Sequence, residues 1–207
     1  MACQVVTISR CLGAGGEEIA RAVANALGFR YTDEEILVRA AEEAGVSPEL
    51  VAEAEHAPGL ITRILEHMAR TSLGPEGWSG AAVMPADTKA DYESLIARIV
   101  REVANEGDVV IVAHGASIPL AGTSGPLRVL VTGSEGVRAE RLALETETDA
   151  SEAGRMIAES DRQRRDYLRR FYDVPEELPT HYDLVVNTDT LAMPLAAQLV
   201  VSAAKGQ

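Results

Sequence analysis

Cysteine, aromatic residues and lysine are scarce in this sequence, and long apolar runs are missing. The two cysteines, Cys3 and Cys11, are separated by a predicted strand, which argues against a disulfide framework or a metal-binding pair. No apolar run approaches the length of a membrane span, and the amino terminus has no basic segment followed by an apolar one. These absences predict a soluble, cytoplasmic protein with no membrane partner.

Positive charge is also in short supply. The formal net charge is -13, and the only lysines are Lys89 and Lys205. A protein surface that binds nucleic acid needs a basic stripe to meet the phosphate backbone, so we expect no nucleic-acid partner. An acidic chain can still bind a nucleotide where its arginines gather at one site.

The sequence is rich in aliphatic residues, arranged in alternating strands and helices. Its 207 residues are 46% hydrophobic but 4% aromatic, which suits a parallel sheet covered by alanine-rich helices. The predicted strands cover residues 4–9, 29–32, 108–113, 127–132 and 182–187. The predicted helices cover residues 15–27, 33–44, 48–55, 91–105, 134–147, 151–172 and 193–204. This alternation predicts an α/β fold with a mainly parallel sheet flanked by helices.

Local signals fix several boundaries of these elements. Gly28 is placed to end the first helix. Helix N-caps are predicted at Asp33, Ser47, Ser134 and Ser151. We interpret Tyr182-Asp183 as the entry to the last strand rather than as a tie to the preceding helix.

We expect a single domain over residues 1–207. It carries a predicted helical and loop insert at about 45–90 and an arginine-rich segment at about 149–180. Residues 71–87, with the sole tryptophan, Trp78, are rich in glycine, proline and serine. Such a composition predicts a mobile or partner-ordered loop.

A glycine-rich stretch, residues 9–18, follows the first strand and opens the first helix. Backbone N–H groups and the helix dipole bind phosphate at such a junction. The regular loop also has a lysine followed by serine or threonine, but Gly16, Glu17 and Glu18 stand there. The two glutamates would repel a polyphosphate unless a metal or an arginine intervened. The predicted phosphate-binding residues are Arg10, Gly13, Ala14, Gly15, Gly16, Glu17 and Glu18; a tight turn without a ligand is the alternative.

Four blocks, in order along the chain, carry a resemblance. They are Thr7–Arg10 with Gly13–Gly16, Gly28–Asp33, Val109–Gly115, and Asp161–Arg165 with Tyr182–Thr188. Together they resemble the cytidylate kinase-like family of nucleoside monophosphate kinases. The resemblance implies a three-layer P-loop NTPase-type fold, with a helical lid over residues 149–180 and a phosphoryl-transfer activity.

The resemblance also implies an acceptor side. Asp33 matches an aspartate that faces the nucleoside monophosphate, and Arg39 falls at the spacing of an arginine that grips its phosphate. A phosphate-gripping arginine of the family is replaced by His114, at the end of a predicted strand. The alternatives are an N-cap for Asp33, a surface role for Arg39 and a structural role for His114.

The segment that resembles the lid holds the densest basic cluster of the chain: Arg162, Arg164, Arg165, Arg169 and Arg170. On a helix, Arg162, Arg165 and Arg169 share one face. Guanidinium groups on that face can neutralise a transferring phosphoryl group, so these three are the predicted catalytic residues. The alternative is a solvated helix face whose arginines pair with Glu159, Asp161 and Asp166.

Two principal functions are compatible with these features. The first is a phosphotransferase that uses ATP with Mg²⁺ and a nucleotide or small phosphorylated acceptor. The second is a catalytically degenerate sensor of a nucleotide or phosphometabolite, favoured by the missing lysine and the two glutamates. A third is an oligomeric scaffold that binds a partner through the loop around Trp78; a homodimer is left open.

Overall fold

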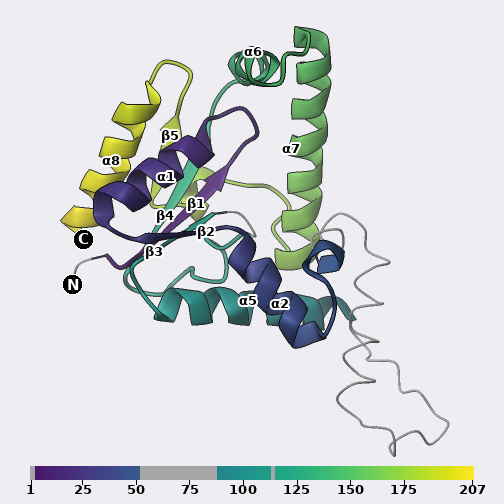
Figure 1. The fold of residues 1–207 in the computed structure, drawn as a ribbon, viewed down its shortest axis with the longest axis vertical. Coiled ribbons are helices and arrows are strands. Elements are labelled where there is room, and N and C mark those ends of the chain that lie inside the picture. The colour runs from purple at the N-terminus through teal and green to yellow at the C-terminus, as the bar shows by residue number, and fades with distance from the viewer. Residues whose placement is uncertain (1–2, 52–87, 113–114) are drawn as a thin grey trace, which may run out of the picture. The chain divides into compact units, whose positions relative to one another are not determined.

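The computed structural model describes residues 3–51, 88–112 and 115–207, in two compact units (Figure 1). The first unit comprises Met1–Asp33 and Arg101–Gln207, and the second comprises Glu34–Val100. The predicted loop with Trp78, and also His114, lie outside the described residues.

The first unit is built on a five-stranded sheet in the order β2-β3-β1-β4-β5. The strands are β1 Val5–Arg10, β2 Arg30–Thr32, β3 Val109–Val112, β4 Pro126–Thr132 and β5 Leu184–Asn187. Every neighbouring pair is parallel. The carboxyl ends of all five strands therefore lie at one edge of the sheet.

The helices of the first unit lie in the predicted places. They are α1 Gly16–Leu27, α6 Glu135–Thr146, α7 Ala150–Tyr172 and α8 Met193–Gly206, with a 3-10 turn η1 at Pro179–His181. Helices α1 and α8 pack side by side, as do α6 and α7 (Figure 1). None of the helices in the described part of the chain combines the length and apolar character that a membrane crossing requires.

The core of the first unit is aliphatic, as the composition predicts. The strands contribute Val6, Ile8, Val110, Val112, Val129 and Val131, and the helices contribute Ile19, Val23, Ala196 and Val200. All of these side chains are buried. Because parallel strands have both faces covered, continuous runs of valine and isoleucine such as β3 are what this architecture needs.

The second unit contains α2 (Glu34–Ala44) and α5 (Thr88–Asn105), of which the residues up to Val100 belong to this unit. An ion pair joins Arg98 of α5 to Glu43 of α2. A further helical segment begins at Pro48, where the Ser47 hydroxyl accepts a hydrogen bond from the Leu50 N–H, as predicted for an N-cap. The rest of that predicted helix lies outside the described residues.

Two predicted caps differ from the structure in an instructive way. The N-cap of α7 is Asp149, whose carboxylate accepts from the N–H groups of Ser151 and Glu152, so Ser151 is a donor inside the first turn and not the cap. Ser134 precedes α6 as predicted, but its side chain makes no capping bond. A carboxylate is the stronger acceptor for first-turn N–H groups, which explains the choice of Asp149.

A buried polar cluster fastens α7 to the chain that enters β5. Arg164 of α7 pairs with Glu177, with 2.7 Å between Nε and Oε2. The Tyr182 hydroxyl donates to the same carboxylate. Next to it, Asp183 accepts two hydrogen bonds from the Arg128 side chain of β4. The interpretation of Tyr182-Asp183 as a simple strand entry was therefore wrong, because the two side chains tie β5 to α7 and β4.

The charge on Glu177 is maintained by its partners. Burial by itself would raise the pKa of Glu177, but the hydrogen bonds and charge of Arg164, with the Tyr182 hydroxyl, outweigh burial and lower it. Burial, and then the nearby Glu177 charge, raise the pKa of Tyr182. The ion pair between Arg164 and Glu177 therefore stays ionised at neutral pH, and it stabilises the fold only while Glu177 is charged.

The lowered pKa of Glu177 predicts how the stability of the protein depends on pH. Glu177→Gln leaves a buried guanidinium unpaired, so we expect a loss of about 3 kcal/mol in the free energy of unfolding at pH 7. Because the folded-state pKa is lowered, the advantage of the wild type is complete above the ordinary glutamate pKa of about 4.3. It disappears as the pH falls through the lower folded value. Urea denaturation from pH 7 to pH 3 measures the difference.

Glu140→Gln, on the exposed side of α6, is the matched control and should change stability little at any pH. If the difference in the free energy of unfolding between wild type and Glu177→Gln stayed constant down to pH 3, this would contradict the conclusion that Glu177 is charged in the folded protein.

Candidate functional site

The residues that follow the strands gather at the carboxyl edge of the sheet. The glycine-rich loop follows the central strand β1, Gly133-Ser134 follows β4, and Thr188-Asp189 follows β5. Asp33 follows β2. In open α/β sheets this edge is where ligands bind. The predicted phosphate-binding residues therefore lie at the expected place in the fold.

The loop depends on glycine at two positions. Gly13 and Gly15 have φ of 74° and 73°, in the left-handed region that favours glycine. A Cβ on Gly13 would lie 2.5 Å from the carbonyl oxygen of Arg138, and one on Gly15 would overlap the side chain of Met193. The glycines thus allow both the turn and its close packing against α6 and α8. This packing is compatible with either reading of the loop, as a turn or as a phosphate site.

The carbonyl oxygens of the loop are held from behind. Leu12 O accepts from Arg138 Nη1 at 3.2 Å. Ala14 O lies 3.0 Å from the hydroxyl of buried Thr188, which accepts in turn from Arg141. With its carbonyls tied to these side chains, the loop has little freedom to turn its peptide groups over.

Several amide groups of the loop are left without partners. Within the described part of the chain, no acceptor meets the backbone N–H groups of Gly13, Gly15, Gly16, Glu17 or Glu18. The last three belong to the first turn of α1, where an intrahelical partner is impossible. A helix N-terminus with free N–H groups and a preceding glycine loop is suited to an anion such as phosphate.

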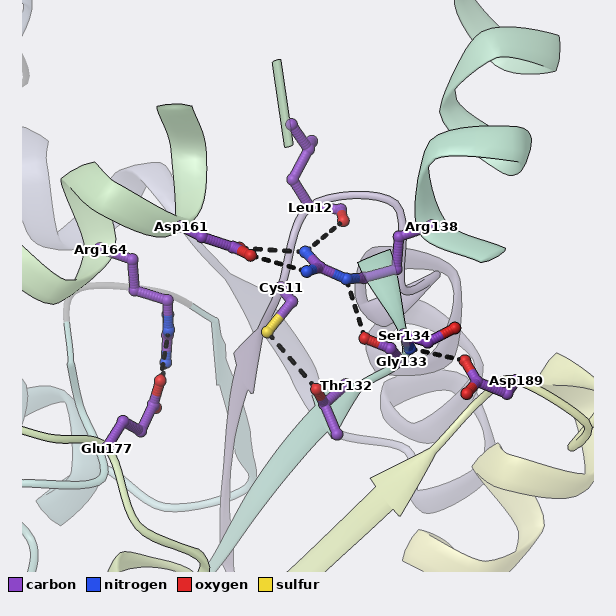
Figure 2. Close-up of polar contacts among 10 residues, drawn as sticks. All are labelled: Cys11, Leu12, Thr132, Gly133, Ser134, Arg138, Asp161, Arg164, Glu177 and Asp189. Atoms are coloured by element: carbon purple, nitrogen blue, oxygen red, sulfur yellow. Dashed lines mark hydrogen bonds and ion pairs between the residues drawn. The ribbon is translucent and has the colours of Figure 1, made fainter. Parts of the chain in front are cut away.

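Arg138 connects the loop to two other elements (Figure 2). Its side chain is only 4% exposed. Besides Leu12 O, the guanidinium donates to Gly133 O at 2.9 Å and grips Asp161 of α7 with both terminal nitrogens, at 3.0 and 2.6 Å. Burial alone would lower the pKa of Arg138, but the hydrogen bonds and charge of Asp161 outweigh it and raise the pKa. One buried cation therefore joins the glycine loop, the end of β4 and the middle of α7.

Arg10, the last residue of β1, lies at the mouth of the loop. Its Nη2 is 2.8 Å from Glu17 Oε1 and 3.9 Å from Asp33 Oδ2. The structure therefore brings together three predicted site residues that come from β1, α1 and the end of β2. A cation between two carboxylates offsets part of the negative charge that the sequence places at this loop.

The three arginines predicted to be catalytic share an exposed face of α7. Arg162 pairs with Glu159, and Arg169 pairs with Asp166, as in the alternative of a solvated face. Asp161 does not take part in that pairing, since it is bound to Arg138. Within the described residues Arg165 has no ion pair or hydrogen bond. It lies one turn after Asp161, on the side of α7 that meets the loop through Arg138.

The remaining predicted site residues, Arg39 and His114, do not belong to the described part of the first unit. Arg39 lies on α2 in the second unit, where it pairs with Glu35. His114 lies outside the described residues. Among the residues that the structure describes, no three histidine, cysteine or acidic side chains gather in a way that could hold a metal ion.

Sequence reasoning missed the side chains that hold the loop from behind: Arg138, Arg141, Thr188 and Asp189. Asp189 accepts a hydrogen bond from the Ser134 N–H at 2.7 Å. A weak signal existed for Arg138, which precedes the buried Leu142 by four residues and so falls on the apolar face of α6. An arginine on the core face of a helix needs a buried acceptor, and that requirement points to a partner elsewhere in the chain.

The close approach at Gly13 gives a stability test. Gly122 has a similar φ of 77° but open space around its missing Cβ. Gly122→Ala should cost about 1–2 kcal/mol for the left-handed backbone alone. Gly13→Ala should cost about 1–3 kcal/mol more, because its Cβ overlaps a carbonyl group. Thermal or urea unfolding measures both, and equal losses in the two variants would refute the close packing of the loop on α6.

Arg138 gives a second test. Arg138→Met strands the Asp161 carboxylate and should lower the free energy of unfolding by about 3–5 kcal/mol. The control is Arg155→Met, which removes an exposed arginine from α7, the helix that carries Asp161. It should lower the free energy of unfolding by about 0–1 kcal/mol. Adding Asp161→Asn to Arg138→Met should recover part of the loss. A double variant no more stable than Arg138→Met would show that the ion pair carries no such energy.

A profile of the cytidylate kinase-like family matches residues 5–190. A cytidylate kinase from Methanopyrus kandleri is 32% identical over 111 residues, which span 50% of this chain and 58% of that protein. The chain is thus similar to little more than half the length of this curated relative.

Solved structures show the same fold at low sequence identity. An uncharacterized protein from Eubacterium ventriosum superposes with a TM-score of 0.67, at 14% identity and 99% coverage of both chains. A shikimate kinase from Bacteroides thetaiotaomicron superposes with a TM-score of 0.52, at 15% identity and 98% coverage of both. The fold is therefore that of the P-loop kinases, as predicted.

The family and the fold agree with the architecture that the sequence predicts. The profile covers the glycine-rich loop, the strands around it and the arginines of α7. The chain belongs to the cytidylate kinase-like family.

Proposed function

We propose that the protein moves the γ-phosphoryl group of a nucleoside triphosphate to a nucleoside monophosphate or a similar small phosphorylated acceptor. The observation that carries this proposal is the loop after β1. The carbonyls of Leu12 and Ala14 are tied to Arg138 and Thr188. Within the described residues, the N–H groups of Gly13, Gly15, Gly16, Glu17 and Glu18 have no acceptor and are left for an anion. Membership of a kinase-like family makes a nucleotide phosphate the preferred anion.

The donor side is the loop itself. Gly13, Ala14, Gly15 and Gly16 let the main chain close around phosphate oxygens, and the first turn of α1 adds its positive dipole end. Arg10 adds a full positive charge beside Glu17. Backbone amides do most of the holding in this arrangement, because no lysine stands in the loop.

The acceptor side comprises Asp33, Arg39 and His114. Support for Asp33 comes from its place after β2, 3.9 Å from the guanidinium of Arg10. For Arg39 and His114 the support is the resemblance of the sequence to the family. A hydrogen-bond donor at each of these two positions would bind the acceptor phosphate, and the Asp33 carboxylate would accept hydrogen bonds from the nucleoside.

The lid arginines Arg162, Arg165 and Arg169 would stabilise the charge on the phosphoryl group in the transition state of its transfer. Arg165 is the strongest candidate of the three. It is exposed, it has no ion pair or hydrogen bond within the described residues, and it lies one turn after Asp161, which binds Arg138. Arg162 and Arg169 pair with carboxylates that are well exposed, and such pairs exchange readily.

The chemistry balances without a general base. An oxygen of the acceptor phosphate forms a bond to the γ-phosphorus, and the bond from that phosphorus to the β,γ-bridging oxygen breaks. The products are a nucleoside diphosphate from the donor and a diphosphate from the acceptor. A phosphate monoester loses its second proton with a pKa of about 6, so the acceptor is already a dianion at neutral pH. Positioning and charge neutralisation are then the whole task of the protein.

Mg²⁺ would enter with the triphosphate. This ion takes one or two carboxylates together with substrate phosphates and water, and Glu17 and Asp33 at the loop mouth are oxygen donors of that kind. The residues present therefore fit it. When bound, Mg²⁺ would neutralise charge on the phosphate groups.

The direct test is turnover. With ATP, Mg²⁺ and cytidine monophosphate in a panel of nucleoside monophosphates and small phosphorylated acceptors, we expect a diphosphate product, followed by chromatography. Arg165→Ala should lower kcat by about 100-fold or more with little change in KM, because its contact forms in the transition state. Arg155→Ala, an exposed arginine near the start of α7, is the control and should retain wild-type kcat. Absence of product across the panel, with folded protein, would contradict the proposal.

The sensor remains the second candidate, favoured by the loop's lack of lysine and by the carboxylates that occupy Arg10. Thermal stabilisation separates the two. A kinase should be stabilised by ATP with Mg²⁺, as mass action requires for a ligand of the native state. Stabilisation by a monophosphate alone, without turnover, would instead support the sensor.

A further inference from the structure

Gly16 is a glycine for a reason that its backbone does not explain. It begins α1 with no positive φ, so any residue could adopt its conformation. The space where its side chain would stand is filled: a Cβ on Gly16 would overlap Cβ of Arg10 and lie 3.2 and 3.3 Å from Arg10 Cδ and Cγ. Residue 16 therefore has no side chain because the stem of Arg10 occupies its place.

Position 16 is also where the regular loop has its lysine, directly before the serine or threonine whose place Glu17 takes. Arg10 thus brings a cation into the volume that a lysine at 16 would have entered, but from the end of β1 instead of the start of α1. Its side chain is 23% exposed, with the guanidinium between Glu17 and Asp33. Arg138, which also contacts the loop, is buried and committed to Asp161.

We propose that Arg10 and Gly16 together replace the missing lysine, with Arg10 contacting the outer phosphates of a bound nucleoside triphosphate. This inference rests on the proposed function and adds the residue that distinguishes a triphosphate from a monophosphate. The guanidinium binds phosphate oxygens in a bidentate manner, which suits it to this task. Glu17 holds it in position while the loop is empty.

The ion pair with Glu17 does not prevent this role. The Glu17 side chain is 59% exposed, and pairs of this kind contribute about 0–1 kcal/mol. The outer phosphates of ATP carry more charge than one carboxylate and lie beside the free amides of the loop. They therefore compete well for Arg10, and the Glu17 carboxylate can turn away from it.

The exchange of one cation for another gives the test. Isothermal titration with ATP and with AMP, each with Mg²⁺, is carried out on wild type and four variants. Arg10→Met keeps a stem over Gly16, and should weaken ATP binding about 10-fold or more while AMP binding changes less than about threefold. The double variant Arg10→Gly/Gly16→Lys, which also removes the Cβ at position 10, should recover most of the ATP affinity. Gly16→Lys alone should bind ATP less well than the double variant, because two side chains compete for one space.

Arg30→Ala is the control. It removes an arginine at the start of β2 that pairs with Glu106, so it makes the same change in net charge without touching the loop. Its ATP affinity should equal that of the wild type. Circular dichroism melting establishes that each variant is folded, and the double variant answers the question if Arg10→Met alone is unstable.

The inference is overturned if Arg10→Met binds ATP within about twofold of wild type, or if the double variant binds no better than Arg10→Met. Those results leave the proposed phosphotransferase standing when the wild type still binds ATP and turns over. A wild type that binds neither ATP nor AMP would overturn both.

Discussion

One buried guanidinium determines how the loop, the sheet and the long helix fit together. Arg138 donates to a carbonyl of the glycine loop, to the carbonyl that follows β4 and to Asp161 of α7 (Figure 2). A charge this deep is tolerated only with a full set of acceptors, so the three elements must all be in place at once. The position of α7, and of the arginines it carries, is in this way coupled to the shape of the loop.

The same interaction explains how a loop without lysine can hold phosphate. Side chains from outside the loop take the carbonyls of Leu12 and Ala14, and five of the loop's amides have no acceptor within the described residues. The direction of the peptide dipoles then supplies a positive potential that no side chain has to provide. A cation is still needed to separate a triphosphate from smaller anions, and Arg10 is the residue that the geometry offers.

Much of the fold could be predicted from local sequence, because strands, helices and the helix end at Gly28 depend on residues that are close together in the chain. The five strands and their parallel direction followed from the alternation of apolar runs and amphipathic stretches. The pairs on the outside of α7 followed from spacing along the helix. The contacts of Arg138 with Asp161 and of Arg164 with Glu177 and Tyr182 did not, since they join residues that only the folded chain brings together. Asp149 and Ser151 were equally good caps by type, and the stronger acceptor took the position.

The central claim is that main-chain amides of the loop hold the phosphates of a nucleotide. Amide nuclear magnetic resonance tests it directly, with a ¹⁵N-labelled protein titrated with inorganic triphosphate, ATP and, as a control without phosphate, adenosine. The account predicts that the amide resonances of Gly13, Gly15, Gly16, Glu17 and Glu18 shift with the first two ligands and stay in place with adenosine. If these five resonances stayed in place while resonances elsewhere moved with ATP, the result would contradict the account.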